Sequence, residues 1–222
     1  MKKKTSMAAL LALASLAPLA SAAPRYSPSE DSSVGLALLQ RGMFAAQGPA
    51  AQSGWIVITE IMKDPAAVTD TRGEWIEVYN ALPWRVNLEG CVLSDDGGAQ
   101  HVINNGGAGL RFLPGRYLVL GSNADPATNG GVQVDYVYGS FSLGNGADQV
   151  ILARSDGVVL DRVDYDDGVT FPDASGKSLS LKGAARDALS NDSGANWCPA
   201  TSPISATNVD AGTPGADNDA CP

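Results

Sequence analysis

From residue 55 to residue 181, apolar and polar residues alternate with a period of two, in short runs separated by Gly, Pro, Asn and Asp. Such runs predict β-strands, because successive side chains of a strand point to opposite faces of a sheet. We expect strands over residues 55–61, 74–80, 86–94, 100–103, 116–120, 132–137, 149–153, 158–165 and 177–181. Short strands with no convincing helix between them indicate an all-β fold, an antiparallel sandwich or barrel.

The turn signals and the alternation add detail to this pattern. Ser-Asp-Gly at 155–157 predicts a tight hairpin, because Gly accepts the positive φ that such turns require. Within 74–80, Ile76 and Val78 share one face, and Trp75 and Glu77 lie on the other. The residues expected in the structural core are Trp55, Trp75, Ile76, Val78, Cys91, Leu93, Tyr117, Val119, Val150, Leu152 and Trp197.

Residues 1–22 have the composition of a signal peptide. Lys2, Lys3 and Lys4 precede an apolar run at 7–19 and then Ala-Ser-Ala at 20–22, which is the order of a charged region, an apolar region and a cleavage site. The apolar run is shorter than the roughly 18 residues of a membrane-spanning helix. We expect cleavage after Ala22 and a secreted, periplasmic or cell-surface protein without a transmembrane segment.

The segments that flank the alternating region differ from it in composition. Residues 23–53 contain scattered prolines and an apolar stretch at 32–46, so a linker and a short docking helix both remain open. Residues 183–222 are rich in Asn, Asp, Ala, Pro and Gly, and we expect an irregular tail anchored by Trp197. The sandwich is then expected over 54–182.

The chain is acidic, with 24 Asp and Glu against 15 Lys and Arg and a formal net charge of −9. Loss of the leader removes three lysines, which leaves 12 basic residues and takes the net charge to −12. A surface of this charge repels phosphate groups, so nucleic acids and anionic membranes are disfavoured as partners.

The three cysteines divide into a C-terminal pair and an isolated residue. Cys198 and Cys221 bracket the tail, and in an exported protein they are expected to form a disulfide. Cys91 lies within an alternating run and has no basic residue near it in the sequence. It is expected to be a small buried hydrophobic residue and not a nucleophile.

A set of motifs follows the strand pattern in a fixed order. They are Glu-Ile-Met at 60–62, Gly-Glu-Trp-Ile-Glu-Val-Tyr-Asn at 73–80, Val-Asn-Leu-Glu-Gly at 86–90, Leu-Ser-Asp at 93–95, Leu-Pro-Gly at 113–115, Tyr-Leu-Val-Leu at 117–120, Ser-Leu-Gly-Asn-Gly-Ala-Asp at 142–148, Val-Ile-Leu at 150–152, Asp-Gly at 156–157, Val-Asp-Tyr at 163–165, Ser-Leu-Ser at 178–180, Asn-Trp at 196–197 and Gly-Thr-Pro-Gly at 212–215. In order and spacing this set resembles lamin-tail domains of the bacterial secreted type, over about residues 54–218. Cys91 stands where those domains usually carry Trp.

The resemblance implies an immunoglobulin-like β-sandwich. It also implies an exported protein, since such domains are appended to nucleases, phosphatases or other hydrolases, or stand alone. We expect a non-catalytic binding or structural module that interacts with a protein, a glycan or an envelope component. The alternative is an accessory or catalytic part of a secreted hydrolase.

Candidate chemistry is sparse in this sequence. His101 is the only histidine, which nearly excludes zinc sites of the His/Cys type, and we expect it at a strand edge. Glu60, Glu74 and Glu77 are carboxylates that neighbouring strands could bring together for acid–base chemistry. The competing interpretation is that they bond backbone groups or basic side chains, and no catalytic residue is assigned.

Two groups of aspartates are the candidates for binding a cation. Asp161, Asp164, Asp166 and Asp167 precede Gly168, and Asp95-Asp96 is a second cluster. Calcium takes six to eight oxygen ligands, and this spacing does not match an EF-hand loop. No cofactor or metal site is therefore expected, with calcium the single candidate left open.

Overall fold

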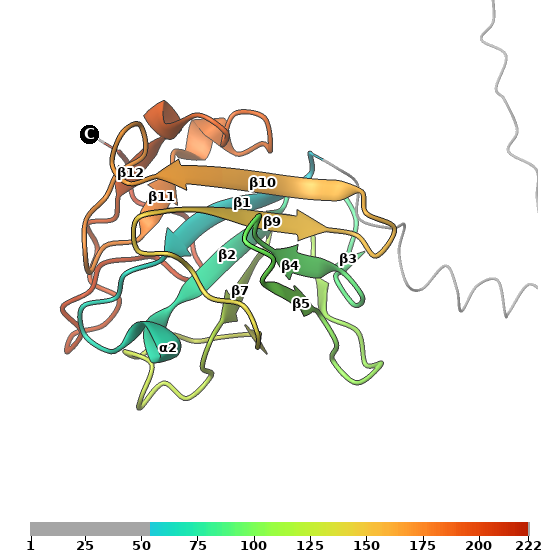
Figure 1. Cartoon of the computed structure of the whole chain (residues 1–222), viewed down its shortest axis with the longest axis horizontal. Coiled ribbons are helices and arrows are strands. Elements are labelled where there is room, and N and C mark those ends of the chain that lie inside the picture. Colours follow the sequence, from blue (N-terminus) through green and yellow to red (C-terminus); the bar gives the residue numbers. More distant parts are fainter. Residues whose placement is uncertain (1–53, 222) are drawn as a thin grey trace, which may run out of the picture. The chain divides into compact units, whose positions relative to one another are not determined.

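The computed structural model describes residues 54–221, which form a β-sandwich (Figure 1). One sheet has six strands in the order β12-β11-β1-β2-β7-β8 and the other has four in the order β10-β9-β4-β5. The six are β1 (Ile56–Met62), β2 (Trp75–Asn80), β7 (Tyr117–Gly121), β8 (Tyr136–Val137), β11 (Leu179–Leu181) and β12 (Trp197–Pro199). The four are β4 (Val92–Ser94), β5 (Gln100–Val102), β9 (Ala147–Ala153) and β10 (Val159–Asp166).

The remaining elements are short. A separate pair of strands consists of β3 (Val86–Asn87) and β6 (Arg111–Phe112), and α2 (Asp70–Gly73) is a single helical turn. Two 3-10 turns, η1 (Gly183–Ala185) and η2 (Gly194–Asn196), lie in the C-terminal region. Strands pair antiparallel throughout the described residues, except β7 with β8, which pair in parallel. The expected all-β antiparallel sandwich is therefore confirmed, with one parallel pair that the pattern did not indicate.

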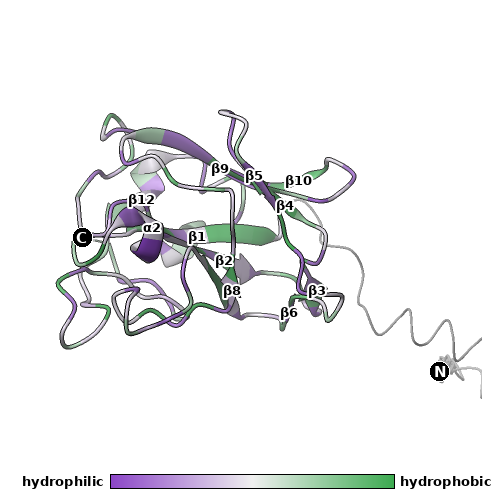
Figure 2. Ribbon diagram, turned by 60° about the horizontal axis from the view of Figure 1, so that its bottom comes forward, coloured by the Kyte–Doolittle hydropathy of each residue, from purple (hydrophilic) through white to green (hydrophobic). Residues whose placement is uncertain are grey.

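The main core lies between the two sheets. Ile76 and Val78 of β2 contribute to it from one sheet, and Val150 and Leu152 of β9 contribute from the other. All seven residues of β1 are buried, and much of its ribbon is coloured as hydrophobic in Figure 2. Apolar burial of this kind is the main favourable term in folding, so the face predicted for Ile76 and Val78 is the face that stabilises the sandwich.

The six-stranded sheet is also covered on its other face. Met62, Trp75, Val119 and Val132 form a second apolar cluster, and Ile204 from the C-terminal region packs against it. In a two-layer sandwich this outer face would be exposed to solvent. Here residues that follow β12 cover part of it. This additional cover explains why the central strands are buried on both sides.

Most of the expected core residues are buried, but Trp55 and Tyr117 are not. Trp55 is 49% exposed, because it precedes the first paired residue of β1 and lies where the described chain begins. Tyr117 is half-buried on the outer face of β7, where its ring lies 5.0 Å from that of Tyr79. The placement of these two side chains in the core was wrong.

The strand limits also differ in places. The expected strand over 86–94 is interrupted by a turn in which the Cys91 amide donates to the Leu88 carbonyl, so β3 and β4 are separate strands. Of 132–137, only the last two residues pair, as β8. The tail contains an unexpected strand, β12, which pairs with β11.

The hairpin predicted at 155–157 is confirmed. It joins β9 to β10, Gly157 has a φ of 84°, and the Gly157 amide donates to the Arg154 carbonyl. The expected signal peptide and the segment 23–53 lie outside the described residues. Within the described part of the chain, no helix has the length and apolar character needed to cross a membrane.

Candidate functional site

Two carboxylates meet on the outer face of the six-stranded sheet. Glu60 of β1 and Glu77 of β2 are directly opposed in the antiparallel register, and both side chains are fully buried. A β-bulge at Thr59 precedes Glu60, because Ile58 pairs with Val78 and the next paired residue of β1 is Glu60. Bulges change the direction of side chains along a strand, and here two acids occupy adjacent positions on one face.

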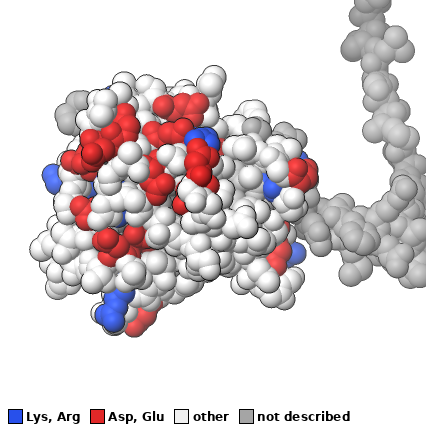
Figure 3. Space-filling view, viewed as in Figure 1, with Lys and Arg blue, Asp and Glu red and all other residues white. Residues whose placement is uncertain are grey.

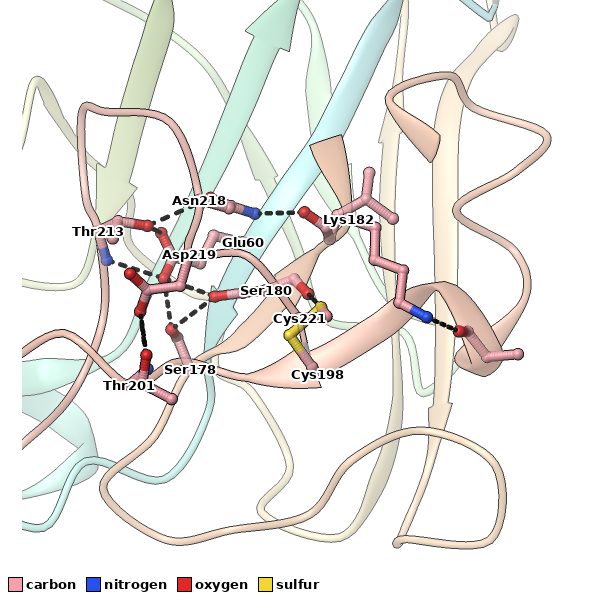
Figure 4. The surroundings of a disulfide bond; sticks show 12 residues. Glu60, Ser178, Ser180, Lys182, Cys198, Thr201, Thr213, Asn218, Asp219 and Cys221 are labelled. Atoms are coloured by element: carbon pink, nitrogen blue, oxygen red, sulfur yellow. Dashed lines mark hydrogen bonds between the residues drawn. A yellow bond between two sulfur atoms is a disulfide. The ribbon is translucent and has the colours of Figure 1, made fainter. Parts of the chain in front are cut away.

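Glu60 accepts hydrogen bonds from two serines and a threonine. The hydroxyls of Ser178 and Ser180, from the β11 segment, donate to its Oε1 atom. The Thr213 amide donates to Oε1 at 2.9 Å, and the Thr213 hydroxyl donates to Oε2 at 3.1 Å (Figure 4). Burial raises the pKa of Glu60, and these hydrogen bonds oppose that rise because they stabilise the charged form.

Glu77 is bonded to the same C-terminal segment. The Gly215 amide donates to its Oε2 atom at 2.7 Å, and the Thr59 hydroxyl donates to Oε1 at 2.8 Å. Burial raises the pKa of Glu77 to about 9, and repulsion from Glu60 adds to the rise. The pair therefore retains a proton at neutral pH, which removes one of two like charges from a buried site.

We call residues 212–221 the strap. Its first residue, Gly212, is closely packed against the sheet. A Cβ atom at this position would lie 3.0 Å from Trp75 Cζ2 and 3.3 Å from Glu60 Oε1. Further along the strap, the Asn218 side chain donates to the carbonyls of Thr59 and Leu181, at 2.7 and 3.0 Å. The strap thus supplies donors to the carboxylate pair and to the bulge.

A disulfide closes the end of the strap, as expected from the sequence. Cys198 of β12 and Cys221 are joined with an S–S distance of 2.03 Å (Figure 4). Near it, Asp219 accepts from the amides of Thr201 and Ser202, both at 2.7 Å. The last residues are therefore attached to the sheet edge covalently and through hydrogen bonds.

Glu74, the third carboxylate considered, lies apart from this pair. It follows α2 and accepts a hydrogen bond from the Leu143 amide at 3.2 Å. Burial raises the pKa of Glu74 to about 7, and the nearby charges of Asp70 and Asp148 add to the rise. The structure thus brings two of the three acids together, and all three bond backbone amides.

A second polar cluster provides hydrogen-bond partners for the backbone of Ile58, next to the bulge. Asp161 of β10 accepts from the Ile58 amide at 2.5 Å and from the Asn191 side chain at 2.7 Å, and Asn191 also donates to the Ile58 carbonyl at 3.2 Å. Burial raises the pKa of Asp161 to about 7. Asn191 was missed from the sequence, because nothing near it in the chain marks a partner 133 residues away.

His101 lies at the opposite edge of the sandwich. Its Nε2 atom is 2.7 Å from the Tyr136 hydroxyl, and its Nδ1 atom accepts from the Gly139 amide at 3.2 Å. Because β5 and β8 are the outermost strands of the two sheets, this contact joins the sheets along one side. A strand-edge position for His101 is what the sequence predicted.

The aspartates considered for calcium point to different partners. Asp161 is directed inward, Asp164 bonds Arg162 at 2.7 Å, and Asp166 accepts from the Thr170 and Phe171 amides. Asp96, of the second cluster, also pairs with Arg162. Among residues 54–221, no three His, Cys, Asp or Glu side chains are grouped to hold a metal ion.

Cys91 is buried and unpaired. Burial raises the pKa of its thiol to about 11, which keeps it protonated and unreactive at neutral pH. It packs in the main core, as expected for a small hydrophobic residue.

The structure is a β-sandwich module with buried carboxylates that accept hydrogen bonds from backbone amides. The family model for the lamin tail domain matches residues 49–167, and the chain belongs to this family, whose fold is immunoglobulin-like. The match ends before β11, β12 and the strap, so the expected extent to about residue 218 is not covered by it. No curated protein and no solved structure matches the chain.

Proposed function

We propose that the chain is an exported, non-catalytic binding module of the lamin-tail type. The observation that carries the proposal is the bonding of Glu60 and Glu77. These were the best candidates for acid–base chemistry, and their oxygens are engaged by the protein's own Thr213 and Gly215 amides. An acid or base must reach the proton that it transfers, and both carboxylates are covered.

A hollow beside β10 is the surface that best supports binding. It has a volume of about 380 Å³ and is lined by Val159, Leu160 and Leu189 together with Asp161, Arg162 and Asp192. Leu189 is 80% exposed, and β10 is the outermost strand of its sheet. Exposed apolar side chains gathered beside the outermost strand of a sheet are typical of protein-binding surfaces.

The charge around this hollow favours a basic partner. Asp96 and Asp164 flank Arg162, and Asp192 lies close enough to Asp164 for repulsion to contribute to its raised pKa. Figure 3 shows acidic side chains gathered over the part of this face where β10 lies in Figure 1. We propose a protein of the cell envelope with a basic, partly apolar segment as the partner, in preference to a glycan.

Binding is tested with the immobilised mature chain, residues 23–222, and an envelope extract of its source. Leu189→Ser and Asp192→Asn change the hollow, and Asp125→Asn is a matched control in a distant exposed loop. A partner that is retained by the wild type and the control, and lost by both hollow variants, supports the proposal. Equal retention by all four proteins would exclude the hollow as the binding surface.

Catalysis is tested separately with phosphodiester, phosphomonoester and glycoside substrates. We expect no turnover by the mature protein. Turnover that disappears in folded Glu60→Gln and Glu77→Gln variants would overturn the non-catalytic assignment and favour the hydrolase alternative.

Export is supported by the Cys198–Cys221 disulfide, because structural disulfides persist in oxidising compartments. Protein is collected from outside the cytoplasm and treated at once with an alkylating reagent. We expect neither cysteine of the pair to be modified, because a disulfide leaves no thiol to alkylate. Recovery of the uncleaved, fully alkylated chain in the cytoplasm would contradict export.

A further inference from the structure

The hollow beside β10 contains a buried carboxyl group that has no counterion. Asp161 lines the hollow and is 2% exposed. Its oxygens accept hydrogen bonds from the Ile58 and Arg162 amides, at 2.5 and 2.8 Å, and from the Asn191 side chain at 2.7 Å. Among residues 54–221, it takes part in none of the ion pairs. A buried carboxylate without a cationic partner is unfavourable, and burial raises the pKa of Asp161 to about 7.

The hydrogen-bond acceptors beside Asp161 outnumber the donors. The Asn191 side-chain amide donates to Asp161 and to the Ile58 carbonyl, but Asn191 Oδ1 is buried and has no partner within the described part of the chain. Asp192 also lines the hollow, and repulsion from its charge adds to the rise in the pKa of Asp161. Negative charge and acceptor capacity are therefore left unmatched around this hollow.

Arg162 is the one cation among the described residues that line the hollow, and it is already engaged elsewhere. Its Nε atom donates to Asp164 at 2.7 Å, and its two terminal nitrogens donate to Asp96 at 3.1 and 2.5 Å. Two carboxylates thus oppose one guanidinium, and the charges of Asp161 and Asp192 are not compensated by it. Charge complementarity favours a cationic ligand.

The apolar part of the lining suits an alkyl chain. Val159, Leu160 and Leu189 belong to it, and Val159 is 43% and Leu189 80% exposed. The turn that carries Leu189 is fixed by Asp187, whose carboxylate accepts from the Leu189 and Ser190 amides at 3.1 and 2.8 Å. Long cationic side chains bury their alkyl stems on apolar surface and keep the charged end for polar partners.

We propose that the hollow is an arginine-binding pocket, which takes one arginine side chain of a partner protein. The alkyl stem lies on Val159 and Leu189, and the guanidinium is held by the carboxyl groups of Asp161 and Asp192. This inference rests on the proposed function, since it names the residue by which the hollow recognises a basic partner. A guanidinium is favoured over an ammonium because its five N–H donors in a planar fork can bond two carboxylates at once. The volume of about 380 Å³ is that of a small-ligand pocket.

The test uses the mature protein, residues 23–222, and Nα-acetyl-argininamide, which carries the arginine side chain without another charge. Binding is followed by NMR titration of the backbone amides. We expect saturable shifts at Val159, Leu189 and Asp192. Nα-acetyl-citrullinamide has the same shape but no charge, and it should bind at least about ten-fold more weakly. Nα-acetyl-lysinamide should bind more weakly than the arginine probe.

Two further measurements address the carboxyl groups. Asp192→Asn should weaken binding of the arginine probe by about ten-fold, and Asp125→Asn, in a distant exposed loop, should leave it unchanged. Asp161 is tested through pH, because its replacement would also disturb the bond to the Ile58 amide. The charged side chains around it are Arg162 on its own strand and Asp192 on the 185–193 loop.

The sign of the pH effect follows from the raised pKa of Asp161. With a pKa of about 7, this group is only about one-tenth ionised at pH 6, and the ionised form is the one that attracts the probe. Affinity for the arginine probe should therefore rise by up to about ten-fold between pH 6 and pH 8.

Several results would overturn the proposal. They are equal binding of the arginine and citrulline probes, equal binding by wild type and Asp192→Asn, an affinity that does not change with pH, or tighter binding of the lysine probe. None of these measurements uses an envelope partner. Probe binding without a retained envelope protein would uphold the pocket and contradict the proposed function, whereas a retained partner without probe binding would do the reverse.

Discussion

The two faces of β2 are buried to a similar extent but are held by different forces. Ile76 and Val78 belong to the apolar core between the sheets, whereas Glu77 on the other face accepts a hydrogen bond from an amide of the strap. The inner face gains stability from area removed from water, which is largely insensitive to pH or redox state. The outer face also has an apolar part, in which Trp75 packs with Met62 and Val119, but around Glu77 it depends on carboxylates and a disulfide, and both respond to solution conditions.

The largest effect is expected on the inner face. Ile76→Ala should lower the free energy of unfolding by about 2–5 kcal/mol, because it removes buried methyl groups and leaves a cavity between the sheets. Denaturant unfolding at neutral pH measures the change. A loss below about 1 kcal/mol would mean that the inner face is not the main source of stability.

The disulfide is expected to come next. Cys198→Ser/Cys221→Ser should lower the free energy of unfolding by about 3 kcal/mol, because the crosslink spans 23 residues of chain. The same unfolding experiment serves, with reduced wild type as the comparison. An unchanged midpoint would show that the strap is held without its covalent link.

The pH dependence of stability should distinguish the outer face, which carries carboxyl groups, from the apolar inner face. The pKa of Glu77 is raised from 4.5 to about 9, and those of Glu74 and Asp161 are raised to about 7. Groups with raised pKa values stabilise the fold below their unfolded pKa, so stability should fall as pH rises from about 5 to 9. Each such group contributes at most about 1.4 kcal/mol per pH unit within its own range.

The residues that face Glu77 define the variants for this experiment. Glu60 repels it, Arg186 attracts it, and the Tyr117 hydroxyl lies in the same charge network. Glu77→Gln mimics the protonated form and should flatten the fall in melting temperature between pH 7 and 9. Glu89→Gln, at the 104–107 loop, removes a carboxyl group elsewhere and should leave the slope unchanged. A wild-type melting temperature that rises toward pH 9 would contradict the raised pKa of Glu77.

The smallest effect concerns a single hydroxyl of the strap. Thr213→Val keeps the shape of the side chain but removes its bond to Glu60, so the loss should be about 1 kcal/mol. Thr207→Val, at an exposed tail position, is the control and should be neutral. If the two variants lose the same free energy of unfolding, the hydrogen bond from the Thr213 hydroxyl contributes no measurable stability.

The sequence predicted the parts of this molecule that depend on local patterns. Alternation located most strands, and it put Ile76 and Val78 on the core face because a strand has only two faces. The turn at Cys91 was hidden by apolar residues on both sides, which continue the alternation across the break. The exposed position of Trp55 was hidden because its pattern is that of a strand, although Trp55 itself precedes Ile56, the first paired residue of β1.

The candidate site was only half visible from the sequence. Opposed carboxylates on adjacent strands could be anticipated from their spacing, but their partners could not. Thr213 lies 153 residues from Glu60, and Asn191 lies 30 residues from Asp161. Such contacts follow from the path of the whole chain and leave no periodicity near either partner.

The bulge at Thr59 has a consequence for the order in which the chain can mature. Its carbonyl is satisfied by Asn218, 159 residues later, so the first strand of the domain is completed by a residue far along the chain. Contacts of such high sequence separation slow folding, and this one cannot form until residue 218 has been synthesised. A chain that is still emerging from a ribosome therefore keeps an unsatisfied backbone group in a central strand until Asn218 has been released.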